Sequence, residues 1–277
     1  MKKLITVLLM LVCGFAVQAQ SVKDLPESKL GWKIGVQSYT FRLFTFKEAI
    51  DKIDSCGARF IESFPGQSLG GGAEGKMDYN MSAAERKLVK SWLKDKGLKI
   101  VNYGVVSYKT EAEWLKVFEF AKDMGIETFT AEPDTKLIAY ISKLCDKFKI
   151  NVAIHNHPDP SFYWNPDVVL NTIKGQSKRM GACADIGHWV RSGLDPVESL
   201  KKLEGRVMAM HMKDLTEKGN KKAHDLIWGQ GQSNISGVAA ELKRQNFKGM
   251  ISAEYEYNWR NSVPEVTASI KYLRSLL

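Results

Sequence analysis

The chain has 277 residues, 44% hydrophobic and 26% charged, which is ordinary for a globular protein and excludes a largely disordered chain. Its length suits one large domain, since a single α/β barrel needs about 250 residues. The formal net charge of +9 would suit nucleic acid, anionic substrates or a cell surface. However, many lysines recur at helix-face spacing, as Lys90, Lys94 and Lys96 do, so solvated helix faces account better for the charge.

The first residues have the pattern of a secretory signal peptide. Lys2 and Lys3 form a short basic start, residues 4–12 are an apolar run, and small residues lead to Ala19. The apolar run is well short of the ~20 residues that a membrane-spanning helix needs. We therefore expect residues 1–20 to be removed and residues 21–277 to act outside the cytoplasm, in the periplasm or secreted, with no membrane span.

From Trp32 onward, short apolar runs alternate with longer amphipathic stretches, which predicts strands followed by helices. The predicted strands are residues 33–38, 59–62, 99–105, 127–131, 151–155, 181–185, 207–211 and 250–254. The predicted helices are residues 45–56, 82–96, 111–124, 135–147, 166–173, 196–203, 235–245 and 263–277. Thr45, Ser82 and Asp134 are suited to N-caps, and Gly97 and Gly125 to helix ends.

Eight strand–helix repeats in this length predict a single (β/α)8 TIM barrel. An open, doubly wound sheet would call for a glycine-rich turn after the first strand, where the chain instead has residues 38–41, Ser-Tyr-Thr-Phe. Cys56, Cys145 and Cys183 have no metal-type spacing, and we expect buried free thiols.

Polar residues gather where the predicted strands end. In chain order they are Glu62, Glu132, His155, Asn156, His157, Asp185, His188, His211, Lys213, Asp214, Glu254 and Glu256. The carboxyl ends of barrel strands meet at one mouth, so these side chains become neighbours in the fold. Carboxylates together with imidazoles suit a divalent metal such as manganese, zinc, cobalt or magnesium.

Four short motifs carry a resemblance to a known family. They are Ala184-Asp185-Ile186-Gly187-His188, Met210-His211-Met212-Lys213-Asp214, Gly229-Gln230-Gly231 and Ala253-Glu254. In order and spacing they resemble the sugar isomerase/epimerase family with a xylose-isomerase-like barrel, and the opening residues 35–41 are similar to that family's first strand. The resemblance covers nearly the whole chain after the signal.

The resemblance implies one divalent metal ion (Mn, Zn, Co or Mg), held by Glu, Asp, His and Glu. Asp185, His211 and Glu254 match the last three of these positions. The chain departs from the pattern at the first, because it has His155-Asn156-His157 where many relatives have Glu-Asn-His. We expect Glu132 to supply the missing carboxylate, with His155 as the alternative ligand.

The chemistry implied by such a site is proton transfer beside a carbonyl group. Glu254 and His157 are the candidates for moving the proton, and His155 and Lys213 complete the expected catalytic set. For substrate binding we expect His188, Gln37, Glu62, Tyr103 and Trp228, the aromatic ones stacking on a sugar ring.

The leading function is isomerisation or epimerisation of a sugar or keto-sugar, unphosphorylated because export separates the protein from sugar phosphates. One alternative is a lyase or hydrolase that cleaves 3-keto-glycosides by elimination, served by an oxidoreductase partner. Another is a sugar-binding barrel without activity. Related barrels that cleave abasic DNA hold three metals through more histidines than the five here, so we expect a small carbohydrate and no nucleic acid as partner. Self-association into a homo-oligomer stays open.

Overall fold

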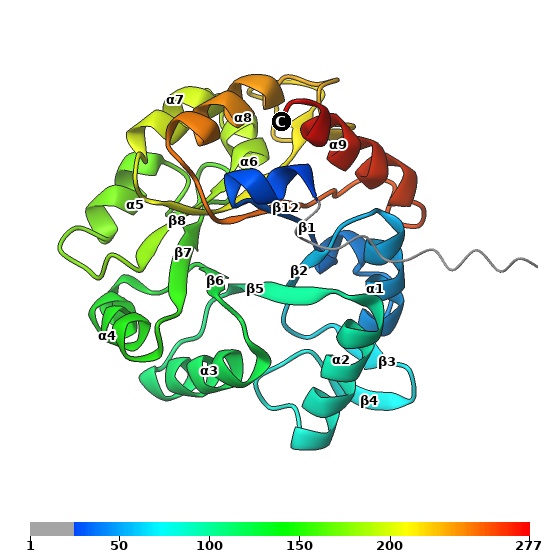
Figure 1. Ribbon diagram of the computed structural model, residues 1–277. Coiled ribbons are helices and arrows are strands. Elements are labelled where there is room, and N and C mark those ends of the chain that lie inside the picture. The colour runs from blue at the N-terminus through cyan, green and yellow to red at the C-terminus, as the bar shows by residue number, and fades with distance from the viewer. Residues whose placement is uncertain (1–24) are drawn as a thin grey trace, which may run out of the picture.

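Eight parallel strands close into a barrel in the computed structural model, which describes residues 25–277 (Figure 1). They are β1 (Lys33–Gln37), β2 (Phe60–Ser63), β5 (Lys99–Val106), β6 (Thr128–Ala131), β7 (Asn151–His155), β8 (Met180–Asp185), β9 (Val207–Met212) and β12 (Met250–Ala253). Around the barrel they follow the order β1-β12-β9-β8-β7-β6-β5-β2. This confirms the predicted TIM barrel; the predicted signal peptide at residues 1–20 lies outside the described residues.

Helices surround the barrel in Figure 1 and connect each strand to the next. They are α1 (Phe46–Ser55), α2 (Ala83–Lys96), α3 (Glu111–Met124), α4 (Ile138–Phe148), α5 (Pro166–Thr172), α6 (Ile186–Arg191), α7 (Pro196–Lys202), α8 (Ile235–Arg244) and α9 (Val263–Ser275). Within residues 25–277, none of these helices combines the length and the apolar character that crossing a bilayer requires.

The predicted helix ends are confirmed in detail. Thr45 and Ser82 each form a capping box with a glutamate three residues later. The side chain of Asp134 caps a short 3-10 helix, Thr135–Leu137, and α4 therefore starts later than predicted, at Ile138. Gly97 and Gly125 end α2 and α3 at φ angles of 64° and 75°, which glycine adopts without steric cost.

Besides short 3-10 helices such as Pro26–Leu30, three features escape the sequence prediction, and each lies after a barrel strand. The hairpin of β3 (Ser68–Gly70) and β4 (Ala73–Lys76) follows β2. A short antiparallel pair, β10 (Asp214–Leu215) and β11 (Asp225–Leu226), forms in the long loop after β9. The third is α6, which starts directly after β8.

The hydrophobic core lies mostly between the barrel and its helices, and small apolar groups fill part of the barrel interior. Ala153, Cys183 and Ala209 pack together on β7, β8 and β9, where their small size leaves room for polar side chains. The register sets Asp185 opposite His211, and His211 opposite Ser252, at the carboxyl ends. Cys56, Cys145 and Cys183 are buried free thiols, as predicted.

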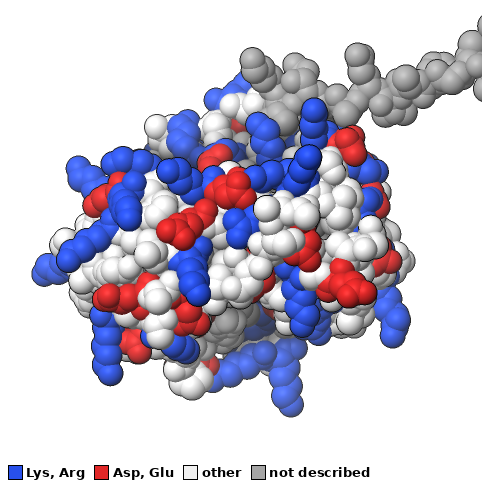
Figure 2. All heavy atoms as spheres, turned by 90° about the horizontal axis from the view of Figure 1, so that it is seen from below, with Lys and Arg blue, Asp and Glu red and all other residues white. Residues whose placement is uncertain are grey.

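Charged side chains are spread over the surface. Figure 2 shows lysine and arginine scattered across one face, with aspartate and glutamate between them, and no continuous basic patch on that face. Many of these groups pair with each other, as Arg244 does with Glu204 and Glu241.

Candidate metal centre and active site

Four buried side chains from four strands converge at the mouth of the barrel. His155 ends β7, Asp185 ends β8, His211 lies near the end of β9, and Glu254 directly follows β12. One ligand atom from each lies within 4.8 Å of the others. Parallel strands bring these residues together although a hundred positions separate the first from the last.

Three atoms in this group are buried and have no hydrogen-bond partner: His155 Nε2, Asp185 Oδ2 and His211 Nδ1. Asp185 Oδ2 lies 3.5 Å from His155 Nε2 and 3.8 Å from His211 Nδ1. Ion-pair contacts compensate two of them in part, since Asp185 Oδ2 lies 3.0 Å from Lys213 Nζ and His211 Nδ1 lies 3.0 Å from Glu254 Oε2. A buried polar atom without a hydrogen bond costs about 1–3 kcal/mol, so the convergence of these ligand atoms indicates a bound ion. Two imidazole nitrogens and two carboxylates are a donor set that divalent zinc, manganese, cobalt or magnesium accepts, and the residues fit one such ion.

A second carboxylate stands behind each imidazole. Oε1 of Glu132 lies 3.0 Å from His155 Nδ1, and Oε1 of Glu62 lies 2.9 Å from His211 Nε2. When these nitrogens donate to the carboxylates, the opposite nitrogens keep free lone pairs that point at one another. Carboxylates placed in this way orient metal-binding histidines and raise their basicity.

Glu62 is enclosed in the barrel interior below His211. Burial alone would raise its pKa, but His211 and the hydroxyl donors of Ser252 and Thr130 outweigh that effect and keep the pKa below its usual value. Ser252 Oγ donates to Glu62 Oε2 at 2.6 Å. We expected Glu62 to bind substrate, but its side chain is fully buried and contacts His211 instead.

Glu132 directly follows β6, which ends at Ala131 as predicted, but its carboxylate does not reach the group of four. It lies on the far side of His155 from Asp185. Oε1 of Glu132 contacts His155 and also His157, and these hydrogen bonds overcome partial burial to lower its pKa to about 2. The structure thus puts the alternative ligand His155, not Glu132, beside Asp185, His211 and Glu254.

Lys213 is the cation of this centre, and its side chain is 1% exposed. Its Nζ lies 3.0 Å from Asp185 Oδ2, 2.7 Å from Glu254 Oε2 and 2.7 Å from Glu256 Oε2. Burial would lower the pKa of Lys213, but the three carboxylates outweigh burial and hold it well above its usual value. Burial alone would raise the pKa values of Asp185 and Glu254. Lys213 and the imidazoles outweigh burial and hold both pKa values well below their usual range.

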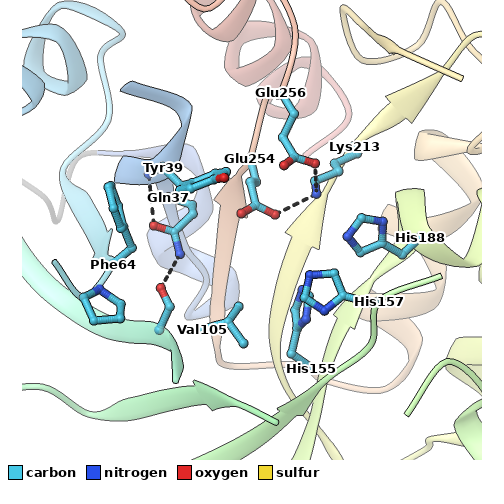
Figure 3. A pocket seen from close by; sticks show the side chains of 12 residues that line it. Gln37, Tyr39, Phe64, Val105, His155, His157, His188, Lys213, Glu254 and Glu256 are labelled. Carbon is cyan, nitrogen blue, oxygen red and sulfur yellow. Dashed lines mark hydrogen bonds and ion pairs between the residues drawn. The ribbon is translucent and has the colours of Figure 1, made fainter. Parts of the chain in front are cut away.

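A cavity of about 250 Å³ opens above these groups (Figure 3). Tyr39, Phe64 and Pro65 form an apolar wall, in which the rings of Tyr39 and Phe64 meet edge to face at 5.2 Å. In Figure 3 the imidazoles of His155, His157 and His188 stand on the opposite side, with Lys213, Glu254 and Glu256 above. This combination of an apolar face and polar groups suits a single sugar ring.

Comparison with known proteins agrees with this architecture. The xylose isomerase-like TIM barrel family matches residues 50–276. The chain belongs to that family. Among curated proteins, none matches it.

Solved structures of similar proteins span almost the whole chain. An uncharacterized protein from Parabacteroides distasonis ATCC 8503 is 38% identical, with a TM-score of 0.74, over 89% of this chain and 100% of that one. A D-tagatose 3-epimerase-like protein is 18% identical, with a TM-score of 0.70, over 88% and 96%. A xylose isomerase-like TIM barrel protein from Mycobacterium smegmatis, in complex with magnesium, is 13% identical, with a TM-score of 0.70, over 88% and 96%.

Most other predicted site residues of this xylose isomerase-like barrel line the cavity. His157, His188, Lys213 and Glu254 do so, and Gln37 lies at its edge. Gln37 donates from Nε2 to the carbonyl of Gly104 at 2.9 Å and accepts from the backbone N–H of Tyr39 at 3.2 Å. These bonds occupy its amide, so Gln37 shapes the start of the apolar wall.

Two predicted aromatic contacts are wrong. Tyr103 points away from the mouth and packs against Phe120 and Phe129, where it is fully buried. Trp228 is buried as well, and its indole N–H donates to the carbonyl of Met212 at 3.2 Å. Both side chains contribute to the packing around the barrel.

Asp214, the residue after Lys213, explains why the chain has the motif Gly229-Gln230-Gly231. The carboxylate of Asp214 accepts backbone N–H groups from Gly229, Gly231 and Ser233, at 2.8 to 2.9 Å. A Cβ on Gly231 would lie 2.5 Å from Asp214 Oδ1, which only glycine avoids. Asp214 therefore fixes the base of the long loop after β9.

Three residues of the site were given no role by sequence reasoning. Glu256 was noted only for its place at a strand end, and it pairs with Lys213. Phe64 and Arg191 lie in a loop and in the unpredicted helix α6, so no strand-end pattern points to them. The position of Arg191 three residues after His188 on α6 would have been the signal, had that helix been predicted.

Proposed function

We propose that this chain is a metal-dependent enzyme that isomerises or epimerises a sugar or keto-sugar by moving a proton beside its carbonyl group. The observation that carries the proposal is the convergence of ligand atoms from His155, Asp185, His211 and Glu254 at the floor of a cavity sized for one ring. A metal held there would polarise a carbonyl or hydroxyl oxygen and stabilise the negative charge that develops on it.

The side chains of the cavity divide the remaining work. Glu254 is a carboxylate kept ionised by Lys213 and His211, and it takes the proton from carbon. His157 stands opposite the apolar wall of the cavity and is held by Glu132. It exchanges a proton with the other face of the same carbon or with a neighbouring carbon of the sugar. Tyr39 and Phe64 pack against the C–H face of the ring, while Lys213 and His188 hold its oxygens.

The cavity supports an unphosphorylated substrate. Among the described residues that line it, Lys213 alone carries a permanent positive charge, and three carboxylates already surround its ammonium group. A phosphate group binds to free cations or to a cradle of N–H donors. The expected export of the chain agrees with a substrate of this kind.

A second candidate function is elimination from a 3-keto-glycoside. It is favoured by the presence in one cavity of a carboxylate, Glu254, and a separate imidazole, His157. Glu254 would take the proton beside the keto group, the C–O bond to the aglycone would break, and His157 would protonate the leaving oxygen. The side chain of His157 is 49% exposed at the mouth, where an aglycone would leave.

One experiment separates these functions. The purified protein, its metal content measured by mass spectrometry, is incubated in D2O with free sugars, keto-sugars and 3-keto-glycosides and followed by NMR. Deuterium incorporation beside a carbonyl with conversion to an isomer supports the isomerase, and a released aglycone supports the lyase. Metal-loaded protein that exchanges no proton in any of them would contradict both and favour a binding protein. Glu254→Gln is the inactive control.

A further inference from the structure

Arg191, at the end of α6, lies behind the wall of the cavity and touches none of the four candidate metal ligands. Its side chain is 10% exposed. One arm of the guanidinium, Nη1, lies 3.0 Å from Nδ1 of His188, whose ring lines the cavity. The contact spans one helical turn, from residue 188 to residue 191, so the geometry of α6 brings the two side chains together.

This contact restricts the protonation of His188. A guanidinium carries only donors, so Nδ1 of His188 has to be the acceptor and cannot carry a hydrogen. The hydrogen of the neutral ring therefore sits on Nε2. The backbone N–H of His188 also donates to Asp185 Oδ1 at 2.8 Å, which fixes the residue at the start of α6.

Arg191 is itself held in place from two other segments. Its Nε and Nη2 donate to the carbonyl of Ala223 at 3.2 and 3.1 Å. Oδ2 of Asp225 lies 3.6 Å from Nη2, and Oε2 of Glu256 lies 3.7 Å from Nη1. Contacts on several sides leave the guanidinium little freedom to turn away from His188, because all three of its nitrogens have an acceptor.

We propose that Arg191 is a positioning residue that fixes His188 as its Nε2–H tautomer, so that the ring presents an N–H donor to the substrate. Nε2 lies on the far side of the imidazole from Arg191, and the ring stands in the cavity wall beside His157 and Lys213 (Figure 3). Nε2 lies 3.5 Å from Oδ2 of Asp185. With that oxygen engaged by a metal, the partner of the donor would be an acceptor oxygen, a carbonyl or hydroxyl of the ligand. This last step rests on the proposed function, whereas the tautomer does not.

The test is the tautomer of His188 in the folded protein. Long-range ¹H–¹⁵N NMR spectra of ¹⁵N-histidine-labelled protein, with and without Zn²⁺, separate protonated from unprotonated ring nitrogens, and His188→Gln assigns the signals. In the wild type we expect a protonated Nε2 and an unprotonated Nδ1. In Arg191→Met we expect both tautomers in exchange, with the two nitrogen shifts moving toward each other.

The matched control is Asp225→Asn, which replaces the carboxyl group beside Arg191 but leaves all donors of the guanidinium in place, so the His188 signals should stay as in the wild type. Arg191→Leu, which likewise has no donor, serves if the methionine variant does not fold. A wild-type His188 with its hydrogen on Nδ1, or a tautomer unchanged in the folded Arg191 variants, would overturn the proposal.

Kinetics separates this inference from the proposed function. With a sugar that the wild type converts, Arg191→Met should raise KM about fivefold to tenfold with a smaller change in kcat, the loss of one hydrogen bond. If no sugar is converted by the wild type, the proposed function fails while the tautomer result stands. An unchanged KM with a mixed tautomer would show that His188 does not donate to the substrate.

Discussion

Lys213 and Glu254 form a buried ion pair in which Nζ lies 2.7 Å from Oε2. The same ammonium lies 3.0 Å from Oδ2 of Asp185, another carboxylate of the candidate metal centre. A metal and Lys213 therefore draw on the same two carboxylates. Without metal, the ammonium of Lys213 balances the charge of Asp185 and Glu254. A bound metal would share these two carboxylates with Lys213, and the two cations would repel each other.

Replacing Lys213 with methionine should separate these effects. Without metal, Lys213→Met should lower the free energy of unfolding by about 3–5 kcal/mol, because a buried charge network loses its cation. Lys213→Met should bind Mn²⁺ more tightly than the wild type, with a dissociation constant lower by at least about tenfold, because no ammonium competes for the carboxylates. Guanidinium unfolding in chelator and calorimetric titration with Mn²⁺ measure the two quantities. Lys221→Met, at an exposed site, is the control, and weaker Mn²⁺ binding in Lys213→Met would contradict the competition.

Glu132 and His155 should respond differently to mutation. His155→Ala should lose the bound metal, as should His211→Ala, because each removes a ligand atom. Glu132→Gln should keep the metal with about 10- to 100-fold lower affinity, since it removes only the carboxylate that orients His155. Metal content by mass spectrometry and affinity by competition with a chelator distinguish the two, with the exposed Glu119→Gln as control. Complete metal loss in Glu132→Gln but not in His155→Ala would restore Glu132 as the ligand.

Asp225 should make the protein less stable as pH rises. Its carboxyl group is buried, and desolvation, only partly offset by Lys213 and Arg191, raises its pKa from 3.8 to about 7. Between these values the unfolded chain has lost a proton that the folded protein retains, so this group lowers the free energy of unfolding as pH rises, by at most about 1.4 kcal/mol per pH unit.

The Asp225→Asn variant lacks that titration. Its stability relative to the wild type should therefore increase from pH 5 to pH 7 and level off above pH 7, measured by guanidinium unfolding at each pH. Asp95→Asn, an exposed aspartate, should show no such trend. A stability difference that does not change with pH would mean that Asp225 is ionised in the folded protein throughout.

The buried thiols should be unreactive in the folded state. Burial raises the pKa of Cys56 and Cys145 to about 12 and that of Cys183 to about 11, and the thiolate is the reactive form. At pH 8 a thiol reagent such as dithionitrobenzoate should label these residues only after guanidinium is added. Rapid labelling of any of them in the native protein would show that its helix or strand opens locally.

The fold could be predicted from sequence because every strand–helix repeat carries its own local signals. The capping boxes that begin α1 and α2 and the glycines that end α2 and α3 are visible in the sequence, and the structure has them where predicted. The short helix α6 was missed because its six residues follow β8 without an intervening loop. A helix of fewer than two turns leaves almost no periodic pattern.

The site could be predicted only as far as strand ends determine it. Asp185, His211 and Glu254 follow from their motifs. The choice between Glu132 and His155 does not, because β6 ends at Ala131 as predicted and the outcome depends on the direction of the Glu132 side chain, which turns toward Nδ1 of His155.

Tyr103 shows a different limit. The register places Ile61 opposite Ile100 and Glu62 opposite Asn102, so β5 holds a bulge at Val101. Val101 packs inside the barrel with Phe60 and Met250, and simple alternation would turn Tyr103 inward too. The bulge instead turns Asn102 inward, toward Glu62, and Tyr103 outward, toward the helices.

The clamp that Asp214 forms on Gly229, Gly231 and Ser233 separates the roles of two consecutive residues that follow β9. Lys213 belongs to the chemistry, while its neighbour Asp214 closes a loop whose two ends stay together whatever lies between them. Of the segment that Asp214 closes, Ala223 and Asp225 hold Arg191, whereas residues 216–222 touch none of the four candidate metal ligands. That stretch of seven residues can therefore lengthen or shorten without rebuilding the centre.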